Sequence, residues 1–124
     1  MRPAKQGDLF ESQVMTQAVC RGLRCDIAHR GLSHDLLISG KRVQCKSKTL
    51  KRGGVPLHNH RKVEKDEFDV LALTYRVDAD DDFRLLYLIP MAELPSKDGR
   101  MVWELRQRWL AQHPEYIDNW AVFD

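Results

Sequence analysis

Residues 35–47 read Asp-Leu-Leu-Ile-Ser-Gly-Lys-Arg-Val-Gln-Cys-Lys-Ser, and apolar and polar side chains alternate along both halves of this stretch. Gly40-Lys41 interrupts the alternation, which predicts a β-hairpin with a two-residue turn at that point. In this register Asp35 pairs with Lys46 and lies diagonal to Gln44, so a carboxylate, an ammonium and an amide share one face. The opposite, apolar face consists of Leu36, Ile38, Val43 and Cys45.

The segments around the hairpin predict one helix and three further strands. Phe10, Val14 and Ala18 recur every four residues, which predicts a helix over 8–23. A short strand is expected over 24–29. The nearly continuous apolar runs over 68–76 and 83–89 are typical of strands with both faces buried.

The segment after Pro90 is predicted to form a helical tail. Val102, Leu105 and Trp109 follow one another at helical spacing and would share a face that covers the sheet. The order of helix, hairpin, basic loop, two buried strands and closing helix is typical of an α/β sandwich with a central mixed β-sheet flanked by helices.

Length and composition indicate a single domain over residues 1–124. The chain has 124 residues, and a hydrophobic fraction of 43% is enough for an ordinary core, which argues against disorder. No apolar run approaches the roughly 20 residues that a membrane helix needs, and no signal peptide is recognisable at the N-terminus. An odd number of cysteines (Cys20, Cys25 and Cys45) suggests reduced thiols and a cytoplasmic location.

The positive charge of the chain is concentrated in one segment. Residues 41–65 contain nine Lys or Arg side chains and a single acid, Glu64, for a net charge of +8. Such a density attracts the phosphates of nucleic acid, and the Gly53-Gly54 pair indicates a mobile basic loop over 50–62. A solvated loop is the alternative. His58 and His60 fit DNA contact or solvation better than a metal site, because no cysteine lies close to them in the sequence and basic residues surround them.

A glutamate on the first helix (Glu11), the aspartate that opens the hairpin (Asp35) and the return strand Gln44-Cys45-Lys46 resemble the PD-(D/E)XK nuclease superfamily. The resemblance implies a restriction-endonuclease-like fold and metal-dependent hydrolysis of phosphodiester bonds. Two positions depart from the superfamily pattern, since His34 replaces a proline and Gln44 replaces an acid. The Gln-x-Lys variant resembles the group I intron homing endonucleases, and the size of the chain resembles archaeal Holliday-junction resolvases.

The resemblance also implies roles for individual residues. Asp35 would be the principal ligand of Mg²⁺ or Mn²⁺, together with Gln44 and the backbone carbonyl of Cys45, and Glu11 would act directly or through a metal-bound water. Lys46 would orient or deprotonate the attacking water, or stabilise charge on the phosphate. The alternative to a catalytic role for Asp35 and Lys46 is an ordinary cross-strand ion pair. Residues expected to contact DNA are Lys48, Thr49, Lys51, Arg52, His58, His60, Arg61 and Lys62.

The leading hypothesis is therefore a divalent-metal-dependent DNA endonuclease of the homing type that acts as a homodimer or homotetramer, since one chain carries one site. A Holliday-junction resolvase is the second reading. A DNA-binding module of the same fold without catalysis, and a domain whose basic loop binds an acidic protein, are the remaining alternatives.

Overall fold

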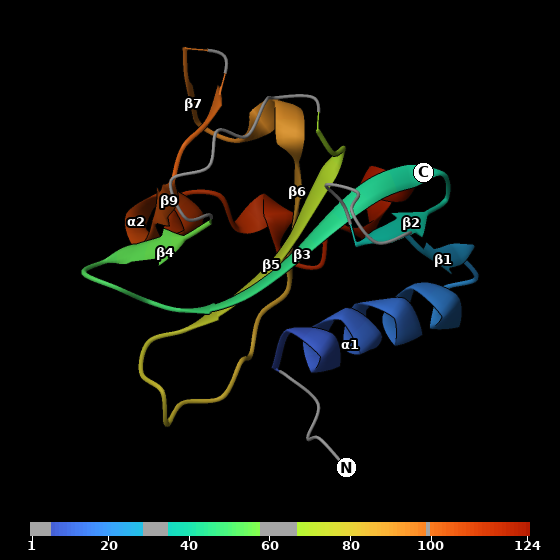
Figure 1. Ribbon diagram of the computed structural model, residues 1–124, viewed down its shortest axis with the longest axis horizontal. Helices are drawn as coiled ribbons and strands as arrows, with labels where there is room; N and C mark the ends of the chain where they lie inside the picture. Colours follow the sequence, from blue (N-terminus) through green and yellow to red (C-terminus); the bar gives the residue numbers. More distant parts are fainter. Residues whose placement is uncertain (1–5, 29–34, 58–66, 99) are drawn as a thin grey trace.

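The computed structural model describes residues 6–28, 35–57, 67–98 and 100–124. Its centre is a five-stranded sheet (Figure 1). Strands β3 and β5 are parallel, and the remaining neighbouring pairs are antiparallel, so the sheet is mixed as expected. In spatial order the strands are β1 (Cys25–Ile27), β2 (Leu36–Ile38), β3 (Lys41–Thr49), β5 (Val70–Arg76) and β6 (Tyr87–Pro90).

Helix α1 (Gln6–Cys20) covers one face of this sheet, and most of the chain after the sheet, here called the C-terminal cover, lies on the other (Figure 1). The C-terminal cover contains two small antiparallel sheets, short helix α2 (Gln107–Ala111) and two 3-10 turns, whereas a third 3-10 turn packs Trp120 and Phe123 in the core on the α1 side. The small sheets pair β4 (Gly54–Pro56) with β9 (Glu104–Arg106), and β7 (Ser96–Lys97) with β8 (Arg100–Met101). The 3-10 turns are η1 (Met91–Glu93), η2 (Pro114–Tyr116) and η3 (Trp120–Phe123).

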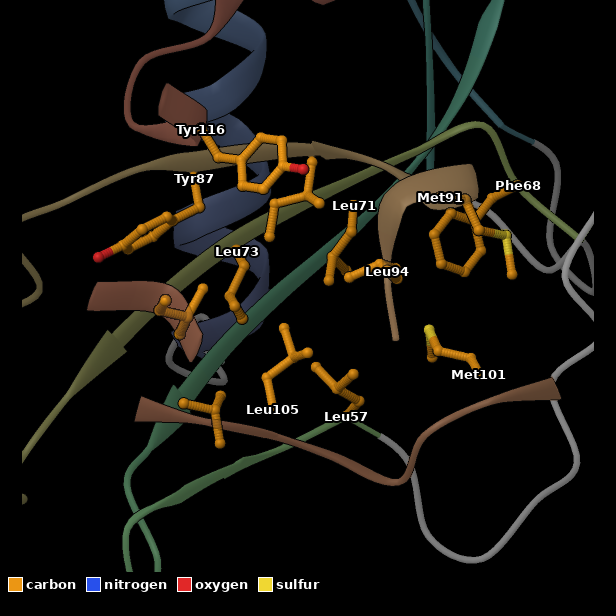
Figure 2. Close-up of a cluster of buried hydrophobic side chains, with 13 residues drawn as sticks. Leu57, Phe68, Leu71, Leu73, Tyr87, Met91, Leu94, Met101, Leu105 and Tyr116 are labelled. Carbon is orange, nitrogen blue, oxygen red and sulfur yellow. The ribbon is translucent and has the colours of Figure 1, made fainter. Parts of the chain in front are cut away.

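Strand β5 contributes to a hydrophobic core on each face of the sheet. Val70 and Ala72 pack in the cluster under α1, and Leu71 and Leu73 pack in the cluster on the opposite face. This confirms the prediction that the strand is buried on both sides. In Figure 2 the β5 leucines point toward Leu57 and other residues of the C-terminal cover.

The helix prediction is confirmed for its buried side, since Phe10, Val14 and Ala18 all lie in the core under α1. The strand predicted over 83–89 begins only at Tyr87, and Leu85 is 46% exposed. The connection between β5 and β6 is thus longer than the apolar run suggested.

The predicted helical tail is wrong. Val102 lies outside every helix and strand, Leu105 belongs to strand β9, and Trp109 belongs to α2, which has only five residues. These three residues still pack in one cluster with Leu110. Apolar spacing therefore identified residues of the core but assigned them the wrong secondary structure.

The turn of the hairpin lies one residue earlier in the chain than predicted. Leu36 pairs with Val43 and Ile38 pairs with Lys41, so the turn is Ser39-Gly40 and not Gly40-Lys41. Ser39 and Gly40 have φ values of 50° and 80°, which are typical of a type I′ turn. The shift moves every pairing by two residues, and the apolar face is retained because side chains alternate with a period of two.

An ion pair fixes the start of the parallel pairing between β3 and β5. Arg42 Nε and Nη2 donate to the Asp69 carboxylate at 3.2 and 3.1 Å, and the Arg42 backbone N–H donates to Asp69 Oδ2 at 2.7 Å. The hydrogen bonds from Arg42 outweigh burial and lower the pKa of Asp69. Both side chains are about 40% exposed, so solvent screens the charge interaction.

Asp69→Asn is expected to lower the free energy of unfolding at pH 7 by about 1 kcal/mol, since it weakens a screened ion pair and its hydrogen bonds. Because the folded-state pKa is lowered, the stabilisation is complete above the usual carboxyl pKa and is lost as pH falls through the lowered value. Urea unfolding of both proteins at pH 7 and at pH 3 measures this. A difference that persists unchanged at pH 3 would contradict the electrostatic origin. Asp26→Asn, in an exposed pair, is the matched control.

Candidate active site

Asp35 is held at the edge of β3 by two hydrogen bonds, one that it donates and one that it accepts. Its backbone N–H donates to the Val43 carbonyl at 2.8 Å, and its Oδ2 accepts the backbone N–H of Cys45, also at 2.8 Å. Asp35 therefore continues the β2–β3 hairpin and places its carboxylate against β3. The observed ladder ends at the pair Leu36–Val43, and Asp35 N–H also donates to Val43, so the predicted pairing of Asp35 with Lys46 is wrong.

The backbone carbonyl of Cys45 faces the same edge as Asp35. Along β3 the main-chain groups alternate in direction, because the Arg42 carbonyl accepts from Asp69 on the β5 side and the Val43 carbonyl accepts from Asp35 on the β2 side. The N–H and C=O of one strand residue point the same way. Cys45 donates its N–H to Asp35, so its carbonyl oxygen also lies on this side, beyond the last ladder pair of β2.

Gln44 and Lys46 project from the face of the sheet that lies opposite α1. Their ladder partners on β5 are Leu71 and Leu73, whose side chains lie in the cluster under the C-terminal cover. Both polar residues are half-buried. The structure thus keeps Gln44 and Lys46 on one face, whereas the Asp35 carboxylate lies at the edge of β3 against the Cys45 N–H.

Glu11 approaches β3 from the other face, since it belongs to α1. Burial raises the pKa of the Cys45 thiol well above its usual range, and the nearby carboxylates of Asp35 and Glu11 raise it further. The Cys45 sulfur therefore stays protonated near neutral pH and is a poor metal ligand. The two acids converge on Cys45, which leaves its carbonyl oxygen as the group that this residue can offer.

The chemistry of these groups fits a hard divalent cation. Asp35 and Glu11 offer carboxylate oxygens, Gln44 offers an amide oxygen and Cys45 offers a carbonyl, and Mg²⁺ prefers oxygen ligands and keeps several waters. Among the described residues no group of three His, Cys, Asp or Glu side chains could hold a metal ion by itself. A cation here would depend on the amide, the main-chain carbonyl and water.

Ser47, two residues after Cys45 on β3, lines a hollow of about 560 Å³. The hollow lies between α1 and the segment 82–84. Phe10 and Gln13 of α1 and Thr74 of β5 line it. The hollow leaves open space beside the candidate site. Sequence reasoning did not find it, because residues 83 and 84 were assigned to the strand predicted over 83–89.

The residues predicted to contact DNA divide into three groups. Lys48 and Thr49 are half-buried in β3, and Thr49 Oγ1 accepts a hydrogen bond from Arg76 Nε at 3.0 Å. Lys51 and Arg52 are exposed at the turn between β3 and β4. His58, His60, Arg61 and Lys62, like His34, lie outside the described residues.

The mobile loop predicted over 50–62 is wrong for its first part. Residues 54–56 form β4, and Val55 and Leu57 are fully buried. Sequence reasoning also missed Arg106, an exposed cation on β9 whose ladder partner is Gly54. A sequence separation of about fifty residues gave no local signal for this pairing.

Comparison with known proteins gives a structural neighbour and no match in sequence. No protein-family model and no curated protein matches the chain. A solved bacterial homing endonuclease, I-Ssp6803I, superimposes with a TM-score of 0.58 over 94% of this chain and 89% of its own, at 20% sequence identity. The chain therefore has the mixed α/β fold of this endonuclease. No helix in the described part of the chain is long and apolar enough to cross a membrane.

Proposed function

We propose that this protein is a divalent-metal-dependent DNA endonuclease of the homing type. The observation that carries the proposal is the hydrogen bond from Cys45 N–H to Asp35, which sets a carboxylate at the edge of β3 where the main-chain carbonyl of Cys45 also lies. This arrangement occurs in a fold that is similar to that of a bacterial homing endonuclease. The Gln-x-Lys resemblance favours the homing type over a junction resolvase.

In this proposal Asp35, Gln44 and the Cys45 carbonyl hold Mg²⁺ or Mn²⁺, and Glu11 reaches it directly or through water. When bound, such a cation would supply positive charge to the scissile phosphate and would lower the pKa of the attacking water. Lys46 presents an ammonium on the same face as Gln44, where it can orient the nucleophile and donate to the phosphate. Gln44 is neutral, so the protein supplies less negative charge than a site with an acid there.

One chain carries one such site, so cutting both strands of a duplex needs a second subunit or a second binding event. We therefore propose a homodimer or homotetramer. Size-exclusion chromatography with light scattering, with and without DNA, measures this state directly.

The function is tested by incubating the protein with a supercoiled plasmid pool that carries random-sequence inserts, and with a synthetic four-way junction. Each substrate is tested in Mg²⁺, Mn²⁺ and EDTA. The expected result is nicking or linearisation of plasmid with either metal, none in EDTA, and a loss of at least about a hundredfold in Lys46→Ala. Lys97→Ala, in exposed strand β7, is the matched control and is expected to cut normally.

Each other outcome selects one of the alternatives. Preferred cutting of the junction would favour a resolvase. Salt-dependent DNA binding without cutting in any metal would favour the inactive module of the same fold. Absence of both binding and cutting would overturn the assignment to DNA.

A further inference from the structure

The turn between β3 and β4, together with β4 and β9, forms a short two-stranded ribbon with basic side chains at its end. We call residues 51–56 and 104–106 the basic ribbon. Its tip lies at one end of the long axis of the molecule, and β1 lies toward the other end (Figure 1). The ribbon is separate from the candidate active site but continuous with it through β3.

The tip has a defined conformation. Lys51 and Gly54 exchange two backbone hydrogen bonds, at 2.8 and 2.9 Å, around the two-residue turn Arg52-Gly53. Arg52 and Gly53 have φ values of 50° and 77°, as in a type I′ turn. The Gly53 carbonyl also accepts the backbone N–H of Gln107 at 3.0 Å, which fastens the tip to the end of β9.

The outer face of the ribbon holds Arg106 close to this tip. Val55 and its partner Leu105 are buried, so by alternation Arg106 and Glu104 lie on the outer face. Arg106 Nη1 donates to Glu104 Oε1 at 2.9 Å, and Arg106 Nη2 lies 3.0 Å from the position that a Cβ on Gly53 would occupy. The guanidinium is thereby oriented by Glu104 and lies against the glycine backbone.

We propose that the basic ribbon enters the major groove of duplex DNA and that Arg52 and Arg106 contact base edges there, while Lys51 contacts phosphate. A two-stranded ribbon fits the major groove, and arginine donates two hydrogen bonds to guanine. An ordered guanidinium loses less conformational entropy on binding than a free one. The proposal rests on the proposed function, because it names how the nuclease would recognise its substrate.

The length of β3 sets the distance between recognition and cleavage. Lys51 lies five positions after Lys46 in the sequence, which corresponds to about 16 Å of extended chain. In this proposal β3 runs along the DNA axis. At 3.4 Å for each nucleotide along a strand, the ribbon then contacts DNA about five base pairs from the cut phosphate. Methylation interference mapped against the cleavage position measures this offset.

The test measures binding of a fluorescent random-sequence duplex by anisotropy in EDTA, so that no cleavage is required. Arg52→Ala and Arg106→Ala are each expected to weaken binding by about tenfold and to relax the sequence preference of the duplexes recovered from the bound fraction, whereas Lys51→Ala is expected to lower the slope of log affinity against log salt by about 1. Arg24→Ala is the matched control. Arg24 is also exposed and also pairs with an acid two residues away, but it lies beside β1. It is expected to bind nearly as the wild type.

A glycine pair separates the conformation of the tip from its charge. Gly53→Ala adds a methyl group 3.0 Å from Arg106 Nη2, whereas Gly22→Ala meets no atom within 4 Å, and both glycines have a φ of 77°. The backbone strain is therefore matched. Both variants are expected to lose similar stability, measured as Tm, and only Gly53→Ala is expected to lose DNA affinity, by about fivefold.

The ribbon proposal is overturned if Arg52→Ala and Arg106→Ala bind like Arg24→Ala, or if the wild type binds no duplex at all. Ribbon-dependent binding by a protein that cuts no DNA in Mg²⁺ or Mn²⁺ would support the ribbon and overturn the nuclease. Normal binding by the ribbon variants, combined with cutting that Lys46→Ala loses, would leave the nuclease standing without the ribbon.

Discussion

Asp35→Asn is expected to lower the rate of metal-dependent DNA cleavage by at least about a thousandfold while the protein remains folded. The substitution removes the negative charge that the Cys45 N–H holds at the edge of β3, beside the Cys45 carbonyl. An asparagine oxygen can still accept the Cys45 N–H, so the hairpin keeps its hydrogen bond. Because Gln44 is neutral, no neighbouring acid on β3 can replace the lost charge.

The measurement is single-turnover cleavage in Mg²⁺, with binding of the same DNA in EDTA and the Tm of each protein recorded in parallel. Asp26→Asn removes an acid from neighbouring strand β1, where Asp26 pairs with exposed Arg24, and is expected to cut at the wild-type rate. Cleavage by Asp35→Asn within tenfold of the wild type, at unchanged Tm, would remove Asp35 from the metal site.

The sequence predicts the elements whose pattern is local. Phe10, Val14 and Ala18 repeat at helical spacing because one side of α1 packs on the sheet, and the apolar run of β5 reflects burial on both faces. In each case one physical requirement acts on consecutive residues. The mixed sheet and the face of the hairpin that meets the core follow from these patterns.

The register of the hairpin could not be read from the same pattern. A shift of two residues leaves every side chain on its original face, so alternation predicts both registers equally well. The turn decides between them. Ser39-Gly40 places glycine second, at a φ of 80°, and Ser39 accepts a φ of 50°, whereas the predicted turn placed glycine first. The difference matters for the site, because it moves Asp35 away from Lys46 and lets its carboxylate accept the Cys45 N–H.

Contacts between distant parts of the chain could not be predicted at all. The pairing of β4 with β9 joins Gly54 to Arg106 and makes a ribbon from a segment expected to be mobile. The sequence of the C-terminal part has helical spacing at Val102 and Leu105, but pairing with β4 draws Leu105 into a strand. Tertiary hydrogen bonds here outweigh local preference.

Leu88→Ala is expected to lower the free energy of unfolding by about 2–5 kcal/mol, which is the largest effect on stability predicted for this chain. Leu88 is fully buried in β6 and pairs with Ala72 in the cluster under α1. Truncation leaves a cavity in this cluster, and the small Ala72 side chain cannot fill it. Leu85→Ala, three residues earlier and 46% exposed, is the matched control and is expected to change stability by less than about 0.5 kcal/mol.

Urea unfolding of the two variants also tests where β6 begins. A strand over 83–89 with both faces buried would make the two leucines similar, whereas the structure buries only Leu88. Losses of similar size would contradict the observed end of the connection between β5 and β6. Below its unfolding transition, Leu88→Ala is expected to cut DNA at the wild-type rate, because Leu88 lies on β6 and contributes no group to the candidate site. A loss of cleavage in the folded variant would show that packing under α1 positions Glu11 or β3.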